Sequence, residues 1–140
     1  WGEKVEPGAS ADGVGNEREK NSFRNLSCIG NQVKIIKGEA KNSIGVVIGK
    51  VGYLPNWVHH LVLHFQQETL DKLAIGDKVQ VRAYGVGLEL LDYPEVRAVS
   101  LSPELLEAMK IEENDGKLVV PVTNVVPAEL VGQGSGGSPS

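Results

Sequence analysis

The sequence predicts a mainly β protein, built as curved sheets or a small barrel with one or two short helices. Several short segments place apolar side chains at every second position, which is the period of a β-strand. The 17 glycines among the 140 residues separate these segments and interrupt some of them, which favours tight turns and bulges over a flat sheet. With 41% hydrophobic residues, the chain is long enough for one core.

The first two predicted strands form a hairpin over residues 32–49. Residues 38–43 are turn-forming types, and Gly45 and Gly49 within the second strand predict a bend or bulge. Lysines of this segment are expected to point into solvent. The alternation places five side chains on one face toward the core, namely Val33, Ile35, Ile44, Val46 and Ile48.

A third strand is predicted over residues 59–65, with Leu61, Leu63 and Phe65 on its inner face. Further along, the sequence predicts a short helix within 66–73, strands over 77–84, 88–91 and 96–101, and a strand over 118–122.

A second short helix is predicted to begin at Ser102. Serine is a favourable N-cap, proline is well tolerated in the first turn, and the carboxylate of Glu104 suits the positive end of the helix dipole. Residues 114–116, Asn-Asp-Gly, predict a turn after it.

Composition divides the chain into three parts. Residues 1–27 are rich in Gly, Glu and Asn and are expected to be an irregular N-terminal segment. Residues 28–131 carry the predicted strands and form the β-rich core domain. Residues 132–140 are a Gly/Ser-rich tail, which leads us to expect a partner that holds it, either a second chain segment or another copy in a homo-oligomer.

Charge argues against nucleic acid as a partner, and hydropathy argues against a membrane. The formal net charge is −4, and the lysines of residues 28–52 face an acidic remainder, whereas nucleic-acid binders need a contiguous basic surface. The chain contains no apolar run near the ~18 residues that a membrane span requires. Its single cysteine suits a reducing compartment, so we expect a cytoplasmic location.

One segment resembles an RNA-binding motif. Lys37-Gly38 followed by Gly45-Val46-Val47 resembles the KOW motif of ribosomal and transcription-factor SH3-like barrels. In that family the loop and its flanking lysines touch RNA. The alternative is a solvated strand edge whose lysines discourage aggregation. The resemblance nominates Lys34, Lys37, Lys41 and Lys50.

The residues that could carry chemistry form no recognisable catalytic constellation. His60 and His64 would lie about 13 Å apart on a strand at ~3.3 Å per residue, so no metal site is predicted. Cys28 lies between apolar neighbours and is typical of core packing. Gly132 and Gly134 belong to a formal G-x-G-x-x-G match, but that fingerprint needs a following helix, and Ser-Pro-Ser follows instead.

Segments along nearly the whole chain share the pattern of one family. They are VEPG at 5–8, LSCIGN at 26–31, KGEAKNSIGVVIGK at 37–50, LAIGDKVQVRAYGVGLELLDYPEV at 73–96 and DGKLVVPVTNVVPA at 115–128. Together they resemble the domain of unknown function 4438 family of bacteria and archaea. The resemblance implies a mostly β protein and longer family members, of which this chain would be a middle portion, as a fragment or a cleavage product.

The family carries no established activity, so the resemblance identifies neither a cofactor nor catalytic residues, and whether the protein is an enzyme stays open. Two function hypotheses follow, a small-molecule-binding protein or enzyme completed by another segment, and a KOW-like module that binds RNA or protein. Positions that fit the family's recurring pattern are the candidates for ligand binding: Cys28, His60, Tyr84, Gly85, Gly87, Asp92, Gly132 and Gly134.

Overall fold

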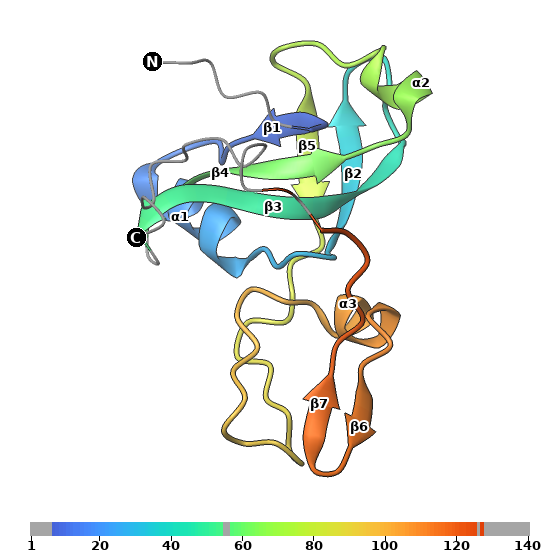
Figure 1. The fold of residues 1–140 in the computed structure, drawn as a ribbon. Helices are drawn as coiled ribbons and strands as arrows, with labels where there is room; N and C mark the ends of the chain where they lie inside the picture. Colours follow the sequence, from blue (N-terminus) through green and yellow to red (C-terminus); the bar gives the residue numbers. More distant parts are fainter. Residues whose placement is uncertain (1–6, 55–56, 126, 128–140) are drawn as a thin grey trace.

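A computed structural model gives the fold of the chain and describes residues 7–54, 57–125 and 127, with the backbone alone over 52–54 and 57–59. Its main feature is a five-stranded antiparallel sheet with the strand order β1-β4-β3-β2-β5 (Figure 1). The strands are β1 (Ala9–Ala11), β2 (Gln32–Lys37), β3 (Ile44–Leu54), β4 (Trp57–His64) and β5 (Lys78–Val81).

The sheet is curved but does not close into a barrel. Register shifts interrupt the β3–β4 ladder, one of them between Val47 and Gly49, and another shift lies between β2 and β5. Such bulges bend a strand and increase its twist. In the described residues β1 and β5 are the two edge strands and do not pair with each other. The prediction of a mainly β fold with curved sheets and minor helix is confirmed.

The core lies on one face of this sheet. The core positions predicted on β2 and over residues 61–65 are confirmed. Val33 and Ile35 on β2 are fully buried. Leu61 and Leu63 on the inner face of β4, and Phe65 just after this strand, are buried as well. The period-two pattern predicted these positions correctly because both strands are regular there.

On β3 the predicted core face is wrong. Val47 is fully buried, whereas Ile44 is 49% and Ile48 is 38% exposed. Gly45 pairs directly with Val33 and therefore faces inward. A Cβ atom at Gly45 would overlap the Phe65 ring. The inward row thus includes a glycine that makes room for Phe65, and the isoleucines point outward.

The segment predicted to be irregular, 1–27, contains β1 and a ten-residue helix, α1 (Glu17–Leu26). Asn16 caps this helix: its Oδ1 accepts from the Glu19 backbone N–H at 3.1 Å, and Glu19 Oε2 accepts from the Asn16 N–H at 2.8 Å. This reciprocal capping box satisfies two N–H groups at the helix start. Phe23 packs against the core from the inner side of α1.

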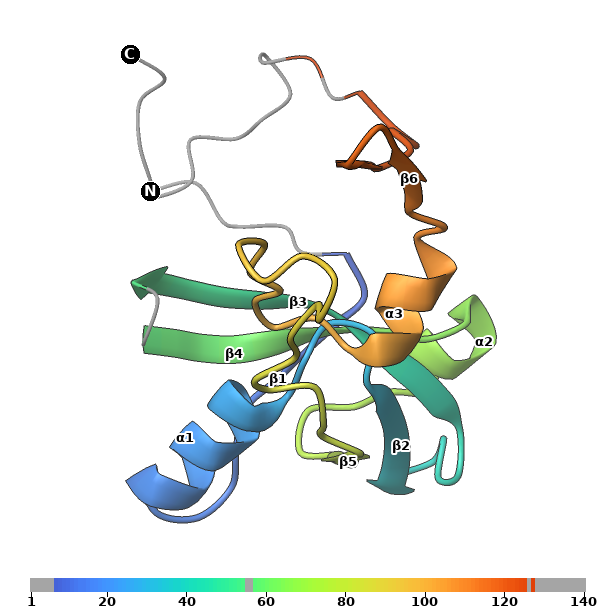
Figure 2. The ribbon, with the colours of Figure 1, turned by 90° about the horizontal axis from the view of Figure 1, so that it is seen from below.

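Residues 86–125 form a second region, here called the lobe. It contains α3 (Pro103–Ala108) and the hairpin of β6 (Glu112–Asn114) and β7 (Lys117–Val119). The four-residue helix α2 (Gln67–Leu70) lies outside the lobe, in the connection between β4 and β5. Ser102 caps α3 as predicted, since its Oγ accepts from the Leu105 N–H at 3.2 Å. Figure 2 shows α3 lying apart from α1.

The β6–β7 hairpin confirms the predicted turn. Asp115 and Gly116 both have left-handed backbones, with φ of 52° and 71°. Two consecutive residues of this kind make the type I′ turn that Asp-Gly favours. None of the described helices is long and apolar enough to cross a membrane.

Candidate functional site

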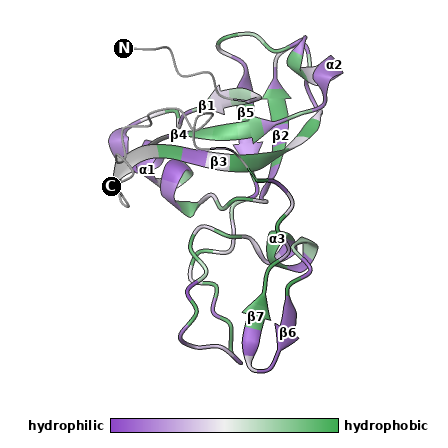
Figure 3. Cartoon of the chain, in the orientation of Figure 1, coloured by the Kyte–Doolittle hydropathy of each residue, from purple (hydrophilic) through white to green (hydrophobic). Residues whose placement is uncertain are grey.

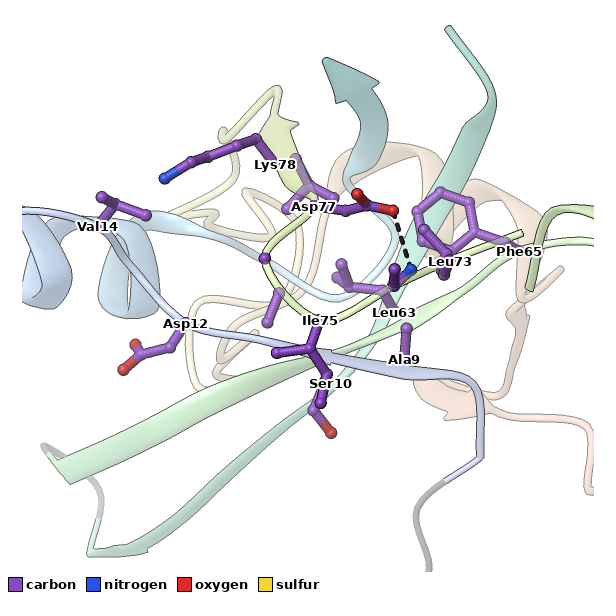
Figure 4. A pocket seen from close by; sticks show the side chains of 14 residues that line it. Ala9, Ser10, Asp12, Val14, Leu63, Phe65, Leu73, Ile75, Asp77 and Lys78 are labelled. Carbon is purple, nitrogen blue, oxygen red and sulfur yellow. Dashed lines mark hydrogen bonds between the residues drawn. The ribbon is translucent and has the colours of Figure 1, made fainter. Parts of the chain in front are cut away.

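A pocket of about 470 Å³ lies where the sheet fails to close, between β1 and the connection from α2 to β5 (Figure 4). Its wall is apolar and includes Leu63, Phe65 and Leu73. Its rim is polar and includes Asp12 and Asp77. A volume of this size and a few polar groups around an apolar wall are typical of small-molecule sites.

The connection on one side of the pocket is a tight loop held by Asp77. Asp77 Oδ2 accepts a hydrogen bond from the Ala74 N–H at 3.0 Å, and the Asp77 N–H donates to the Ala74 carbonyl at 3.0 Å. The same carboxylate packs against Gly38, where a Cβ atom would overlap it. Asp77 is therefore occupied in shaping the loop, and Ile75 at its tip is fully exposed beside the pocket.

On the other side, Asp12 is bound by Arg24 of α1. The Arg24 Nε donates to Asp12 Oδ1 at 2.6 Å and the Nη2 to Asp12 Oδ2 at 2.5 Å. This bidentate pair, together with the Gly13 backbone N–H and the charge of Lys20, holds the pKa of Asp12 below its usual range. Both carboxylates that line the pocket are thus already engaged. The pocket suits holding a ligand better than it suits acid and base chemistry.

Three of the candidate residues meet elsewhere, at the junction between the sheet and the lobe. They are Cys28, Tyr84 and Gly85. Asn31, which is fully buried, organises this junction. Its Oδ1 accepts from the N–H groups of Cys28 at 2.7 Å and Tyr84 at 3.2 Å, and its Nδ2 donates to the Tyr84 carbonyl at 2.9 Å. Asn31 was missed from the sequence, where it stands as one more polar residue in a turn.

Gly85 serves close packing at this junction. Its backbone is left-handed, with a φ of 111°, and an added Cβ atom would lie 2.7 Å from the Leu101 carbonyl oxygen and 3.4 Å from Cys28 Sγ. Backbone bonds complete the contact, since the Ile29 N–H donates to the Ser100 carbonyl at 2.7 Å and the Ser102 N–H to the Ile29 carbonyl at 2.9 Å. Gly85 therefore lets the backbone of residues 101 and 102 approach closely.

Lys50 crosses from β3 to the same junction. Its ammonium group donates to the carbonyls of Asn25 at 3.3 Å and Ser27 at 3.0 Å, and to Ser100 Oγ at 3.3 Å. A cation is favourable at the C-terminal end of α1, where free carbonyls gather. Burial lowers the pKa of Lys50 and raises that of the neighbouring Cys28 thiol. Lys50 is therefore turned inward, unlike the three other lysines that the KOW resemblance nominates.

The other candidates lie apart from the pocket and from this junction. His60 lies in β4 opposite Val51. Gly87 borders a second hollow of about 490 Å³ between residues 87 and 98. Asp92 lies in an exposed turn of that segment. No group of three His, Cys, Asp or Glu side chains in the described part of the chain is placed to hold a metal ion. Gly132 and Gly134 lie outside the described residues.

Comparison with known proteins gives one family and one solved structure. The model of the family described as domain of unknown function (DUF4438), N-terminal, matches residues 1–107. A structure described as the crystal structure of TM1086 is similar in fold, with a TM-score of 0.69 and 42% identity. The alignment covers 79% of this chain and 38% of that one, so the matched part is well under half of the relative's length. A search of curated proteins gave no match.

Proposed function

The chain belongs to the DUF4438 family. We propose that it is part of a longer protein that binds a small molecule. The ligand lies in the pocket between β1 and the α2–β5 connection. The observation that carries the proposal is the pocket of about 470 Å³ at the open side of the sheet. An apolar hollow with a few polar groups at its rim is the usual form of a small-molecule site.

The lining indicates the kind of ligand. Val14 and Ile75 line the pocket with exposed apolar side chains, and Leu73 is half-buried beside them, which favours a ligand with a hydrophobic body. Lys78 is the one lining side chain that carries a positive charge, and Asp12 and Asp77 are engaged with protein groups. A small organic acid with an apolar body fits this distribution, since Lys78 at the rim can pair with a carboxylate. The proposal includes binding and no catalytic step.

The test is a thermal-shift screen of the purified chain against small organic acids of graded hydrophobic size. A ligand at about one hundred times its Kd stabilises the folded state by about 2.7 kcal/mol, which corresponds to several degrees in Tm. Ala74→Trp is the blocking variant, because Ala74 is an exposed residue that lines the pocket. We expect this variant to abolish the shift.

Ala83→Trp provides the matched control, since Ala83 is also exposed but does not line the pocket. It should keep the full ligand-dependent shift. If both tryptophan variants respond to the ligand as the parent chain does, binding occurs elsewhere and the pocket assignment is wrong. A screen without any stabilising ligand would contradict the proposal that this chain binds such acids.

A further inference from the structure

The outer face of the sheet carries basic and apolar side chains together. Lys34 pairs with Ile44 on one side and with Gln80 on the other, so these side chains share the face opposite the core, and Lys37 is exposed at the end of β2 after a register shift. Ile36 and Ile44 are exposed beside them, by 44% and 49%. We call this surface the basic face; it comprises Lys34, Ile36, Lys37 and Ile44.

No carboxylate belongs to the strands that form this face. The sequences of β2, β3 and β5 contain lysines but neither Asp nor Glu. Glu39 and Asp77 lie in the turns at one end, and Asp77 is engaged with Ala74. A chain with a net charge of −4 therefore presents a locally positive surface.

The lobe has the opposite charge and a similar apolar character. Among residues 86–125 the sequence has eight carboxylates against three basic residues, and all eight carboxylates are exposed. Large apolar side chains are exposed among them, with Leu91 at 88% and Val99 at 78%. Figure 3 shows hydrophobic and hydrophilic stretches alternating along this region. The carboxylates are Glu89, Asp92, Glu95, Glu104, Glu107, Glu112, Glu113 and Asp115.

These two surfaces do not cover each other within one chain, since Lys34 and Ile36 on one and Leu91 and Glu113 on the other are all exposed. We propose that the acidic lobe of one copy docks on the basic face of a second copy. Complementary charge steers such an encounter, and apolar burial stabilises it. Such a contact closes a two-fold dimer when it is made twice and reciprocally, and it builds a ring or an open chain of subunits when it is head-to-tail.

Single-stranded RNA is the competing occupant of the basic face, and two observations favour protein. The exposed side chains between the lysines are aliphatic, whereas single-strand binders use aromatic rings on which bases stack. The inward turn of Lys50 also removes one cation from the set that the KOW resemblance nominates.

Sedimentation velocity of the 140-residue chain over a concentration series tests the proposal. We expect reversible association that weakens as salt is added, because salt screens exposed charge pairs. Lys34→Glu/Lys37→Glu makes the basic face acidic, and Glu112→Lys/Glu113→Lys makes strand β6 of the lobe basic. Each double variant alone should weaken association at least about tenfold in Kd through like-charge repulsion.

A mixture of the two double variants should associate again, since the acidic face of one then meets the basic lobe of the other. The control Arg18→Glu/Lys72→Glu changes the charge equally at exposed positions outside both surfaces, and it should associate as the parent chain does. A monomer at every concentration overturns the proposal. So does failure of the mixture to recover, which would indicate a contact between like surfaces. Salt-sensitive binding of a labelled RNA oligonucleotide by a monomeric chain, lost in Lys34→Glu/Lys37→Glu, would assign the face to RNA.

Discussion

The sheet and the lobe differ in how much each one buries. Nine hydrophobic residues are buried in the part of the chain that the structure describes, and all of them lie between Cys28 and Phe65. Among residues 86–125, Ser102 is the one buried residue. The sheet therefore has a core that can stabilise it, since apolar burial is the main favourable term in folding. The lobe must draw its order from local turns, from α3 and from its attachment to the sheet.

That attachment is polar. Asn31 ties the segment 28–31 to Tyr84, and backbone bonds tie Ile29 to residues 100 and 102. Hydrogen bonds contribute about 1 kcal/mol each when made, but a buried group left without a partner costs more. The lobe is therefore positioned by a specific hydrogen-bonded junction, whereas the sheet is stabilised by apolar packing.

The largest expected effect comes from truncating the core. Phe65→Ala removes a ring that is 1% exposed and should lower the free energy of unfolding by about 3–5 kcal/mol. The matched change in the lobe, Leu91→Ala, truncates a side chain that is 88% exposed and should cost less than about 0.5 kcal/mol. Urea unfolding measures both. Equal losses would show that the lobe has a core of its own and would end the comparison.

A smaller effect is expected at the junction. Gly85→Ala places a Cβ atom against the Leu101 carbonyl and requires a left-handed backbone, so we expect a loss of about 2–4 kcal/mol from strain and overpacking. Gly87 is also left-handed but has open space around it, so Gly87→Ala should show the backbone strain alone, about 1–2 kcal/mol. The same urea unfolding separates them. If the two variants lose stability equally, close packing at Gly85 contributes nothing.

The sequence predicted the sheet better than its attachments. Period two correctly assigned Val33, Ile35 and the inner row of β4 because ordinary side chains fill those positions. On β3 the pattern failed because the inward row includes Gly45, which a hydrophobicity pattern reads as a gap. Helix α1 was missed because its sequence is mostly polar, although Asn16 and Glu19 carry a capping-box signature that could have located its start.

The pocket could not have been predicted from the sequence. It arises where two edge strands far apart in the chain border one space, and a linear pattern does not give strand order. Cys28, Tyr84 and Gly85 were nominated by family pattern, and the structure brings them together at the junction, away from the pocket. The residue that joins them, Asn31, carries no periodic or compositional signal.

The smallest expected effect concerns acid. Because Arg24 holds the pKa of Asp12 below its usual value of 3.8, this pair stabilises the fold fully above that pH. The contribution is lost as the pH falls below 3.8 through the lower pKa of the folded state. Asp12→Asn should therefore be less stable than the parent at pH 6, and the two should converge as the pH falls through the lower pKa of the folded state. The exposed carboxylate Glu95 provides the control, and Glu95→Gln should show no such pH-dependent difference. Thermal unfolding from pH 2 to 6 measures this, and a constant difference across the range would contradict the assignment.

Hydrogen exchange tests the contrast between packed sheet and tethered lobe most directly. The measurement uses the 140-residue chain at a concentration at which it sediments as a monomer, and it compares the amides of β2, β3 and β4 with those of residues 103–119. We expect the central strands to exchange only through global unfolding and the lobe to exchange through a separate opening of lower free energy. Equal protection of both regions would contradict the account, because it would mean that sheet and lobe unfold as one cooperative unit.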